Sequence, residues 1–205
     1  VPILWKLELP ATFFISSGFV GLSKTYEDTF IRNNLRLKQS YCSEKTVGLT
    51  CDDIRRIADH GFTIGGHTLS HCNLSDIMDI TKLKYEIAED KLFLEQTIGT
   101  KINYFSYPFG FYYNPNINID KVLHEAGYKG AVTTMSGFND RNTYPFLLHR
   151  ESTDATMHSS VFKARVYGNY DAVHYIRKLI GLEKWSISII SRKKMFNILG
   201  LFNFL

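Results

Sequence analysis

The sequence has few of the features that assign a chain to a special class. Its three cysteines, Cys42, Cys51 and Cys72, are unevenly spaced and form no C-x-x-C pair, so they indicate neither a disulfide framework nor a cysteine zinc site. No stretch approaches the run of about 18 apolar residues that a membrane-spanning helix needs. The net charge of +4 is small and the basic residues are scattered except near the C-terminus, so we expect no nucleic-acid partner.

The remaining composition is that of a globular domain. With 205 residues the chain is long enough for one domain with a substantial core, and its contents of 44% hydrophobic and 21% charged residues are ordinary for a soluble protein. It begins at Val1 without an initiator methionine or a signal-like segment. We therefore expect a fragment of a longer chain.

Strand and helix patterns alternate along the sequence. Short runs rich in β-branched and aromatic residues predict strands at 10–15, 62–64, 102–107 and 130–134. Helical patterns lie between them, at 50–60, 79–98 and 119–126, with a weaker one at 26–39. This order predicts an α/β fold with a parallel sheet or barrel, in which the chemistry lies at the carboxyl ends of the strands.

The clearest helix is the amphipathic segment from Asp79 to Ile98, which Gly99 is expected to end. Its expected apolar side carries Leu83, Ile87, Leu94 and Ile98. Elsewhere on the helix we expect the charged residues Lys82, Lys84, Glu89, Asp90 and Lys91.

Two histidines stand four positions apart in the stretch "IGGHTLSH". His67 falls where the strand at 62–64 should end, and a helical turn there would let His67 and His71 face one point. Zinc accepts imidazole nitrogen, but a catalytic site usually needs three protein ligands, so a third is required. The alternative is that both are polar cap or loop residues at a helix N-terminus.

Four segments, "PATFFISSGFVG", "GFTIGGHTLSH", "FSYPFGFY" and "AGYKGAVTT", follow one another in a familiar order. From roughly Leu4 to Gly181 the chain resembles the polysaccharide deacetylase family, the NodB-type carbohydrate esterases. The resemblance implies an irregular (β/α) barrel, incomplete at the N-terminus, over 1–181. A basic, apolar tail at 182–205 would follow it.

The resemblance also implies an activity and its cofactor. The family removes acetyl groups from N- or O-acetylated polysaccharides or oligosaccharides by hydrolysis at a divalent metal ion, usually zinc. By this match His67 and His71 are metal ligands, and the hydroxyl of Thr68 steadies their loop. The resemblance also favours a cell-envelope or extracytoplasmic location, and a cytoplasmic location is the alternative.

The segment Tyr107-Pro108-Phe109-Gly110 resembles the family's R-x-P-[YF] loop, with Ser106 in place of the arginine. The match implies that Tyr107, Pro108 and Phe109 contact the substrate. It also implies that the backbone N–H of Phe109 binds the oxyanion of the acyl group. The alternative is a simple proline turn with buried aromatic residues.

The segment Phe146-Leu147-Leu148-His149-Arg150 resembles the family's last motif, L-x-H, whose histidine protonates the departing amine. Other branches of the family have L-P-R at this point and no histidine. His149 is thus either a general acid or a strand-end histidine without a catalytic task.

The family's first motif, T-F-D-D-G, supplies the base and the metal aspartate from the strand before "PATFF". Only nine residues precede Pro10, so we expect that motif to be missing from this chain. The sequence Thr50-Cys51-Asp52-Asp53 imitates it in letters, but its position and the Thr50–Asp53 spacing favour a helix cap.

Two functions remain open at this point. The first is a metal-dependent polysaccharide deacetylase, and the second is a non-catalytic carbohydrate-binding or scaffold domain on the same fold. The tail at 182–205 mixes basic and apolar residues, which is typical of a segment on an anionic membrane surface or of a closing helix.

Overall fold

The computed structural model describes residues 1–35, 48–110, 112, 114, 116–153 and 156–169. The chain divides into two compact units, of which the first comprises residues 1–135 and 139–150 and the second comprises 136–138 and 151–205. The tail at 182–205 lies outside the described residues, so its expected membrane contact stays a prediction.

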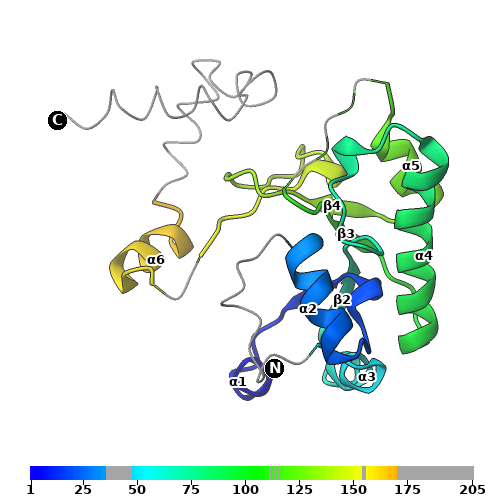
Figure 1. Cartoon of the computed structure of the whole chain (residues 1–205). Coiled ribbons are helices and arrows are strands. Elements are labelled where there is room, and N and C mark those ends of the chain that lie inside the picture. The colour runs from blue at the N-terminus through cyan, green and yellow to red at the C-terminus, as the bar shows by residue number, and fades with distance from the viewer. Residues whose placement is uncertain (36–47, 111, 113, 115, 154–155, 170–205) are drawn as a thin grey trace. The chain divides into compact units, whose positions relative to one another are not determined.

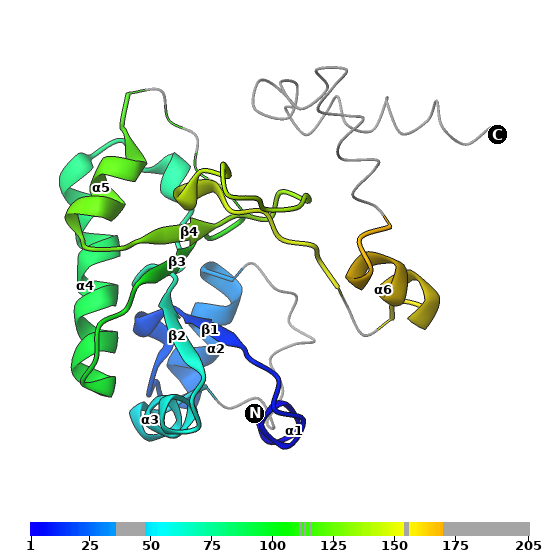
Figure 2. The same ribbon diagram turned by 180° about the vertical axis from the view of Figure 1, so that it is seen from behind.

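A parallel sheet forms the centre of the first unit (Figures 1 and 2). Its strands are β1 (Thr12–Ile15), β2 (Thr63–Gly66), β3 (Tyr104–Ser106) and β4 (Gly130–Val132), and they pair in that order. All three pairings are parallel, so the segments that follow the four strands meet at one edge of the sheet. This edge is where an α/β protein places its functional residues.

Helices connect the strands and cover the sheet. Those of the first unit are α1 (Pro2–Lys6), α2 (Lys24–Asn33), α3 (Cys51–Asp59), α4 (Ile80–Ile98) and α5 (Ile119–Glu125). Short 3₁₀ turns are η1 (Ser17–Phe19), η3 (Leu74–Asp76) and η4 (Pro145–Leu147), and α6 (Ser159–Val166) lies in the second unit. The predicted α/β class is confirmed. The four strands form an open sheet, to which Leu148 adds a parallel bridge beside Val132.

The core lies between the sheet and the helices α3, α4 and α5. Helices α4 and α5 lie along the same side of the sheet (Figures 1 and 2), and an ion pair of 2.8 Å between Lys84 and Glu125 joins them. Leu83, Ile87 and Leu94 of α4 are fully buried, as their spacing predicted. Each such side chain stabilises the fold by about 1.5–3 kcal/mol.

The ends of α3 and α4 follow the predicted signals. Thr50 and Asp53 form a capping box at the start of α3, in which the Asp53 N–H donates to Thr50 Oγ1 at 3.2 Å. Asp79 caps α4 by accepting the Thr81 N–H at 2.8 Å. Gly99 ends α4 with φ of 71°, a backbone conformation that glycine adopts without steric cost.

Strand β2 runs two residues beyond its predicted end and includes Gly65 and Gly66. A Cβ on Gly65 would lie 2.5 Å from the ring of Phe14. On Gly66 it would overlap the hydroxyl of Tyr128 and lie 2.9 Å from Asp90 Oδ2. The close approach of these neighbours requires glycine, although glycine is a poor strand former, which is why the pattern missed it.

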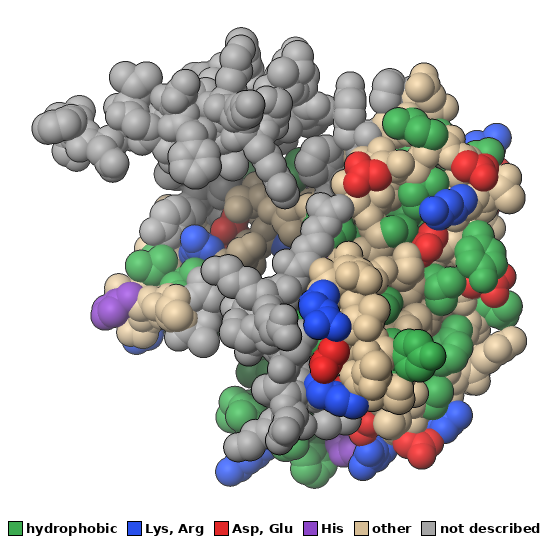
Figure 3. Space-filling view, viewed as in Figure 1, with side chains coloured by type: hydrophobic (Ala, Val, Ile, Leu, Met, Phe, Trp, Pro, Cys, Tyr) green, Lys and Arg blue, Asp and Glu red, His purple; other side chains and the backbone are tan. Residues whose placement is uncertain are grey.

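The surface of the molecule shows no special patterning on the face seen in Figure 3. Acidic and basic side chains are interspersed there, so no extended patch of one sign covers that face. Within the described ranges, no helix has both the length and the apolar content that a membrane span requires.

We expect Gly66→Ala to destabilise the fold by about 1–3 kcal/mol, because its methyl group overlaps Tyr128 and Asp90. The Tyr128 hydroxyl is buried and has no hydrogen-bond partner in the described part of the chain. Tyr128→Phe alone should therefore change stability little. The double variant should regain part of the loss, as measured by urea unfolding of all four chains. Equal losses in the single and double variants would contradict this account of the glycine.

Candidate active site

His67 is oriented by the neighbouring strand. It follows β2 directly, and its Nδ1 lies 2.6 Å from the carbonyl oxygen of Ser106 at the end of β3. A carbonyl oxygen only accepts hydrogen bonds, so Nδ1 carries the proton and Nε2 carries the lone pair. Burial lowers the pKa of His67 to about 4. The imidazole is therefore neutral at neutral pH.

The ring of His71 meets that of His67, with centroids 4.8 Å apart and planes at 77°. The loop between them is not the expected helical turn. Thr68 and His71 have φ of 66° and 53°, in the left-handed region that residues with a Cβ rarely adopt. Such strain persists only where surrounding contacts hold the backbone, and it concentrates at functional sites.

The second imidazole is also oriented by a backbone carbonyl. His71 Nδ1 lies 3.2 Å from the carbonyl oxygen of Asn34, which follows α2. The Asn34 side chain donates to the carbonyl oxygen of Ser70 at 2.6 Å and so holds the same loop a second time. Metal-ligating histidines typically donate one ring N–H to such a partner and coordinate through the other nitrogen. The pair therefore fits a divalent metal ion.

Two imidazoles make up only part of a zinc site. Among the residues that the structure describes, no group of three or more His, Cys, Asp or Glu side chains is placed to hold a metal ion. Asp52 and Asp53 lie in the first turn of α3, where they pair with Arg55 and Arg56. Neither carboxylate lines the cavities at the histidines, so this segment is the predicted helix cap.

The loop after β3 brings Phe109 to the histidines. Its ring centroid lies 5.0 Å from that of His71, and its φ of 59° is a third left-handed conformation at this site. Its side chain is 43% exposed, whereas Pro108 and Tyr107 are buried. The Tyr107 hydroxyl donates to the carbonyl oxygen of Phe146 at 3.1 Å. Tyr107 thus supports the loop from the core, and Phe109 is the exposed residue of the three. The substrate contacts of Tyr107, Pro108 and Phe109 stay a prediction.

Two buried carboxylates of α4 hold the loops at this edge. Asp90, which is fully buried, accepts the N–H of Ser17 at 2.8 Å and the N–H of His67 at 2.9 Å. One turn earlier, Glu86 accepts the N–H and the hydroxyl of Ser70 at 2.9 and 2.8 Å. Burial raises the pKa of Asp90 to about 6. Helix α4 therefore fixes both the loop after β1 and the loop that carries the histidines.

Sequence reasoning missed this role of α4. The amphipathic pattern places Asp90 and Lys91 away from the apolar side, but both are buried, so that prediction is wrong. The signal was the spacing: Asp90 stands three positions after Ile87 and four before Leu94, within the apolar stripe itself. A carboxylate in an apolar stripe indicates a buried hydrogen-bonding partner.

The remaining predicted residues lie as follows. The Thr68 hydroxyl is buried without a hydrogen-bond partner among the described residues, and its expected role in steadying the loop stays a prediction. The His149 N–H donates to Asn139 Oδ1 at 2.9 Å, and the His149 carbonyl oxygen accepts a hydrogen bond from Asn139 Nδ2 at 3.0 Å. Its Nδ1 is buried, also without a partner among the described residues, and its role as general acid stays a prediction.

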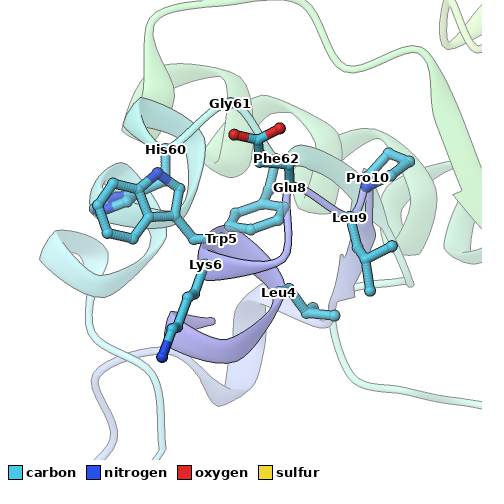
Figure 4. Close-up of a pocket in the computed structure, with 9 residues that line it drawn as sticks. All are labelled: Leu4, Trp5, Lys6, Glu8, Leu9, Pro10, His60, Gly61 and Phe62. Carbon is cyan, nitrogen blue, oxygen red and sulfur yellow. The ribbon is translucent and has the colours of Figure 1, made fainter.

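Two cavities of about 310 Å³ open at the histidine pair. His67 and His71 line the first together with the end of β1, and His71 and Phe109 line the second. A larger cavity of about 510 Å³ is lined by residues that include Trp5, His60, Pro10 and Phe62 (Figure 4). Its residues Pro10 and Phe62 precede β1 and β2, so it lies at the amino ends of the strands. His67 and His71 lie at the opposite edge of the sheet, where the strands end.

The chain is thus an α/β protein with a parallel sheet, and a pair of imidazoles lies at the carboxyl edge of that sheet. The sequence matches the model of the polysaccharide deacetylase family over residues 1–131. The chain belongs to the polysaccharide deacetylase family.

Known relatives agree with this assignment. YxkH of Bacillus subtilis (strain 168), which is named as a polysaccharide deacetylase, is 26% identical over 152 residues, 71% of this chain and 53% of YxkH. The chain thus spans about half the length of this curated relative. The Streptococcus pyogenes deacetylase PplD, solved in complex with acetate, has a TM-score of 0.60 at 19% identity, covering 78% of this chain and 60% of PplD. IcaB from Ammonifex degensii has a TM-score of 0.55 at 20% identity, and the match covers 75% of this chain and 60% of IcaB. Both structures share the fold.

Replacing Asp90 by Ala should destabilise the protein by roughly 2–6 kcal/mol, because two buried N–H donors lose their acceptor at about 1–3 kcal/mol each. Glu89→Ala is the matched control, since the neighbouring Glu89 is exposed. Urea unfolding at neutral pH measures the free energy of unfolding of both variants. Equal stability of the two variants would show that Asp90 does not hold the loops.

The buried His67 should make stability depend on pH. Its folded pKa of about 4 lies below the unfolded value of 6.5, so the unfolded state binds more protons between these values. Metal-free protein should lose about 3 kcal/mol from this group as pH falls from about 6.5 to about 4, at about 1.4 kcal/mol per pKa unit. In His67→Gln this loss should be absent.

His124→Gln, at an exposed histidine of α5, is the control and should keep the wild-type pH dependence. Urea unfolding in the presence of a chelator, at several pH values, gives the comparison. A pH dependence unchanged in His67→Gln would refute the assignment to His67.

Proposed function

We propose that this chain is the histidine-bearing part of a metal-dependent deacetylase that hydrolyses N- or O-acetyl groups on a polysaccharide or oligosaccharide. The observation that carries the proposal is the pair of rings at the carboxyl edge, each with Nδ1 at a backbone carbonyl oxygen. Membership of the polysaccharide deacetylase family supports the substrate class. The family resemblance also favours a cell-envelope or extracytoplasmic location.

In this proposal His67 and His71 bind a divalent ion, most simply zinc, through Nε2. When bound, such an ion supplies Lewis-acid chemistry, lowering the pKa of water and polarising a carbonyl group. The carbonyls of Ser106 and Asn34 fix the ring tautomers, and burial keeps His67 neutral and able to coordinate.

The chain's own residues have further tasks in this reaction. The backbone N–H of Phe109, in its left-handed turn beside His71, donates to the acyl oxygen as negative charge develops there. The exposed ring of Phe109 forms part of the rim that an acetylated sugar contacts. His149 is the candidate that returns a proton to the leaving group.

A carboxylate must complete the metal site and act as the base. The topology is compatible with a carboxylate on a further strand that pairs with β1, because β1 is an outer strand of the described sheet. Ile15 at the end of β1 lies in register with Gly66, the residue before His67. A parallel strand added beside β1 would end at this same edge, which is the position that the family resemblance implies for T-F-D-D-G.

The 205-residue chain should show little or no deacetylation of N-acetylglucosamine oligomers with added zinc, because general-base catalysis of about 10²–10⁴-fold is lost. A version preceded by a strand bearing T-F-D-D-G should be active. In that version His67→Ala or His71→Ala should abolish acetate release, while His124→Ala should retain it. Equal rates for the short and extended chains would show that another carboxylate acts as the base.

The second candidate is a non-catalytic carbohydrate-binding domain on this fold. It is favoured by the lack of a third ligand near the histidines among the described residues and by the uncharged Ser106. An extended chain that binds the oligomers and zinc but releases no acetate would support this second function.

A further inference from the structure

A cationic side chain, that of Arg150, also lies at the carboxyl edge of the sheet. The backbone of Leu148 continues the sheet beyond β4, where its N–H donates to the Ala131 carbonyl oxygen at 3.0 Å and its own carbonyl accepts the Thr133 N–H at 2.8 Å. Two residues later, the N–H of Arg150 donates to the carbonyl oxygen of Met135 at 3.0 Å. The backbone of Arg150 is thus held beside the end of β4.

The guanidinium of Arg150 is anchored close to His67. Its Nε donates to the carbonyl oxygen of Thr133 at 2.6 Å. Thr133 follows Val132, which is in register with Ser106, and the Ser106 carbonyl holds the ring of His67. Given the spacing of neighbouring strands and the rise per residue, these two carbonyl groups lie roughly 6 Å apart. The charge of Arg150 is accordingly one cause of the lowered pKa of His67, after burial.

Arg150 has donors and charge beyond those that its anchor uses. A guanidinium has five N–H donors, and the bond to Thr133 uses the one on Nε. The group is half-buried, and within the described ranges burial is the cause that lowers its pKa, with no carboxylate acting to raise it. A partly buried cation without a counter-charge is unfavourable, and the planar fork of Arg matches a carboxylate.

We propose that Arg150 binds a carboxylate beside the histidine pair, and that this carboxylate is the acetate released by the hydrolysis. The inference rests on the proposed function: water adds to the acetyl carbon, the bond to the sugar nitrogen or oxygen breaks, and the products are the deprotected sugar and acetate. The Nη groups of Arg150 donate to the two acetate oxygens, while Nε stays on Thr133. Arg150 is then the product-binding residue of the acyl subsite.

The test uses the metal-free chain and sodium acetate as the probe. The Nε–H signal of Arg150 in ¹⁵N NMR spectra should shift and saturate with acetate, whereas sodium chloride at equal ionic strength should not reproduce the shift. Arg150→Gln should weaken acetate binding roughly tenfold or more, because charge-assisted hydrogen bonds are lost. Arg150→Lys, which keeps the charge without the fork, should bind with intermediate affinity.

Arg141→Gln is the matched control, because Arg141 is an exposed arginine of the same unit, and it should bind acetate like the wild type. The inference is overturned if wild-type protein shows no saturable acetate binding, if chloride produces the same response, or if Arg150→Lys and Arg150→Gln bind acetate as tightly as wild type. Equal weakening by Arg141→Gln would also overturn it.

This measurement is independent of the proposed activity. It requires neither metal nor acetylated sugar, so a chain that binds acetate through Arg150 but never releases acetate would refute the function and leave the anion site standing. An active extended chain whose acetate affinity does not depend on Arg150 would refute the anion site alone.

Discussion

The arrangement of this site depends on two carboxylates buried on one helix. Asp90 and Glu86 stand one turn apart on α4 and together accept hydrogen bonds from the loops that follow β1 and β2. The backbone adds to this, because the Leu69 N–H donates to the Glu86 carbonyl oxygen and the Leu69 carbonyl accepts the Gly18 N–H. These bonds hold the histidine loop in a conformation that its own residues do not favour.

That conformation has an energetic cost which the rest of the fold offsets. Thr68, His71 and Phe109 have positive φ, and left-handed backbone at such residues costs on the order of 1–3 kcal/mol each. Burial of the Asp90 carboxylate and of the His67 ring disfavours their charged forms. Stability lost in this way is common at functional sites, where geometry matters more than the depth of the energy minimum.

The edge of the sheet gathers complementary chemistry from every strand. β1 leads into the turn that Asp90 binds, β2 into the histidines, β3 into Phe109, and β4 to the carbonyl that anchors Arg150. Imidazole nitrogens suit a metal ion, and a guanidinium suits an anion.

Local sequence determined the elements and the position of the histidines. The run before Ser16, the capping box of Thr50 and Asp53, and the apolar stripe of α4 act over a few neighbouring residues, so their patterns predicted strands and helices correctly. The spacing of His67 and His71 indicated a pair, because residues so close in sequence remain close in any compact loop. The motif order along the chain similarly indicated the family.

Tertiary structure alone decided how the pair is held and what surrounds it. Whether Asp90 faces water or two backbone N–H groups depends on loops 23 and 73 residues away, which no helical pattern contains. The close packing at Gly66, the burial of Tyr107 and the approach of Arg150 to His67 likewise arise from strands that are neighbours in the sheet and distant in sequence. Hydrogen bonds and burial act between groups in space, so these features exist only once the chain has folded.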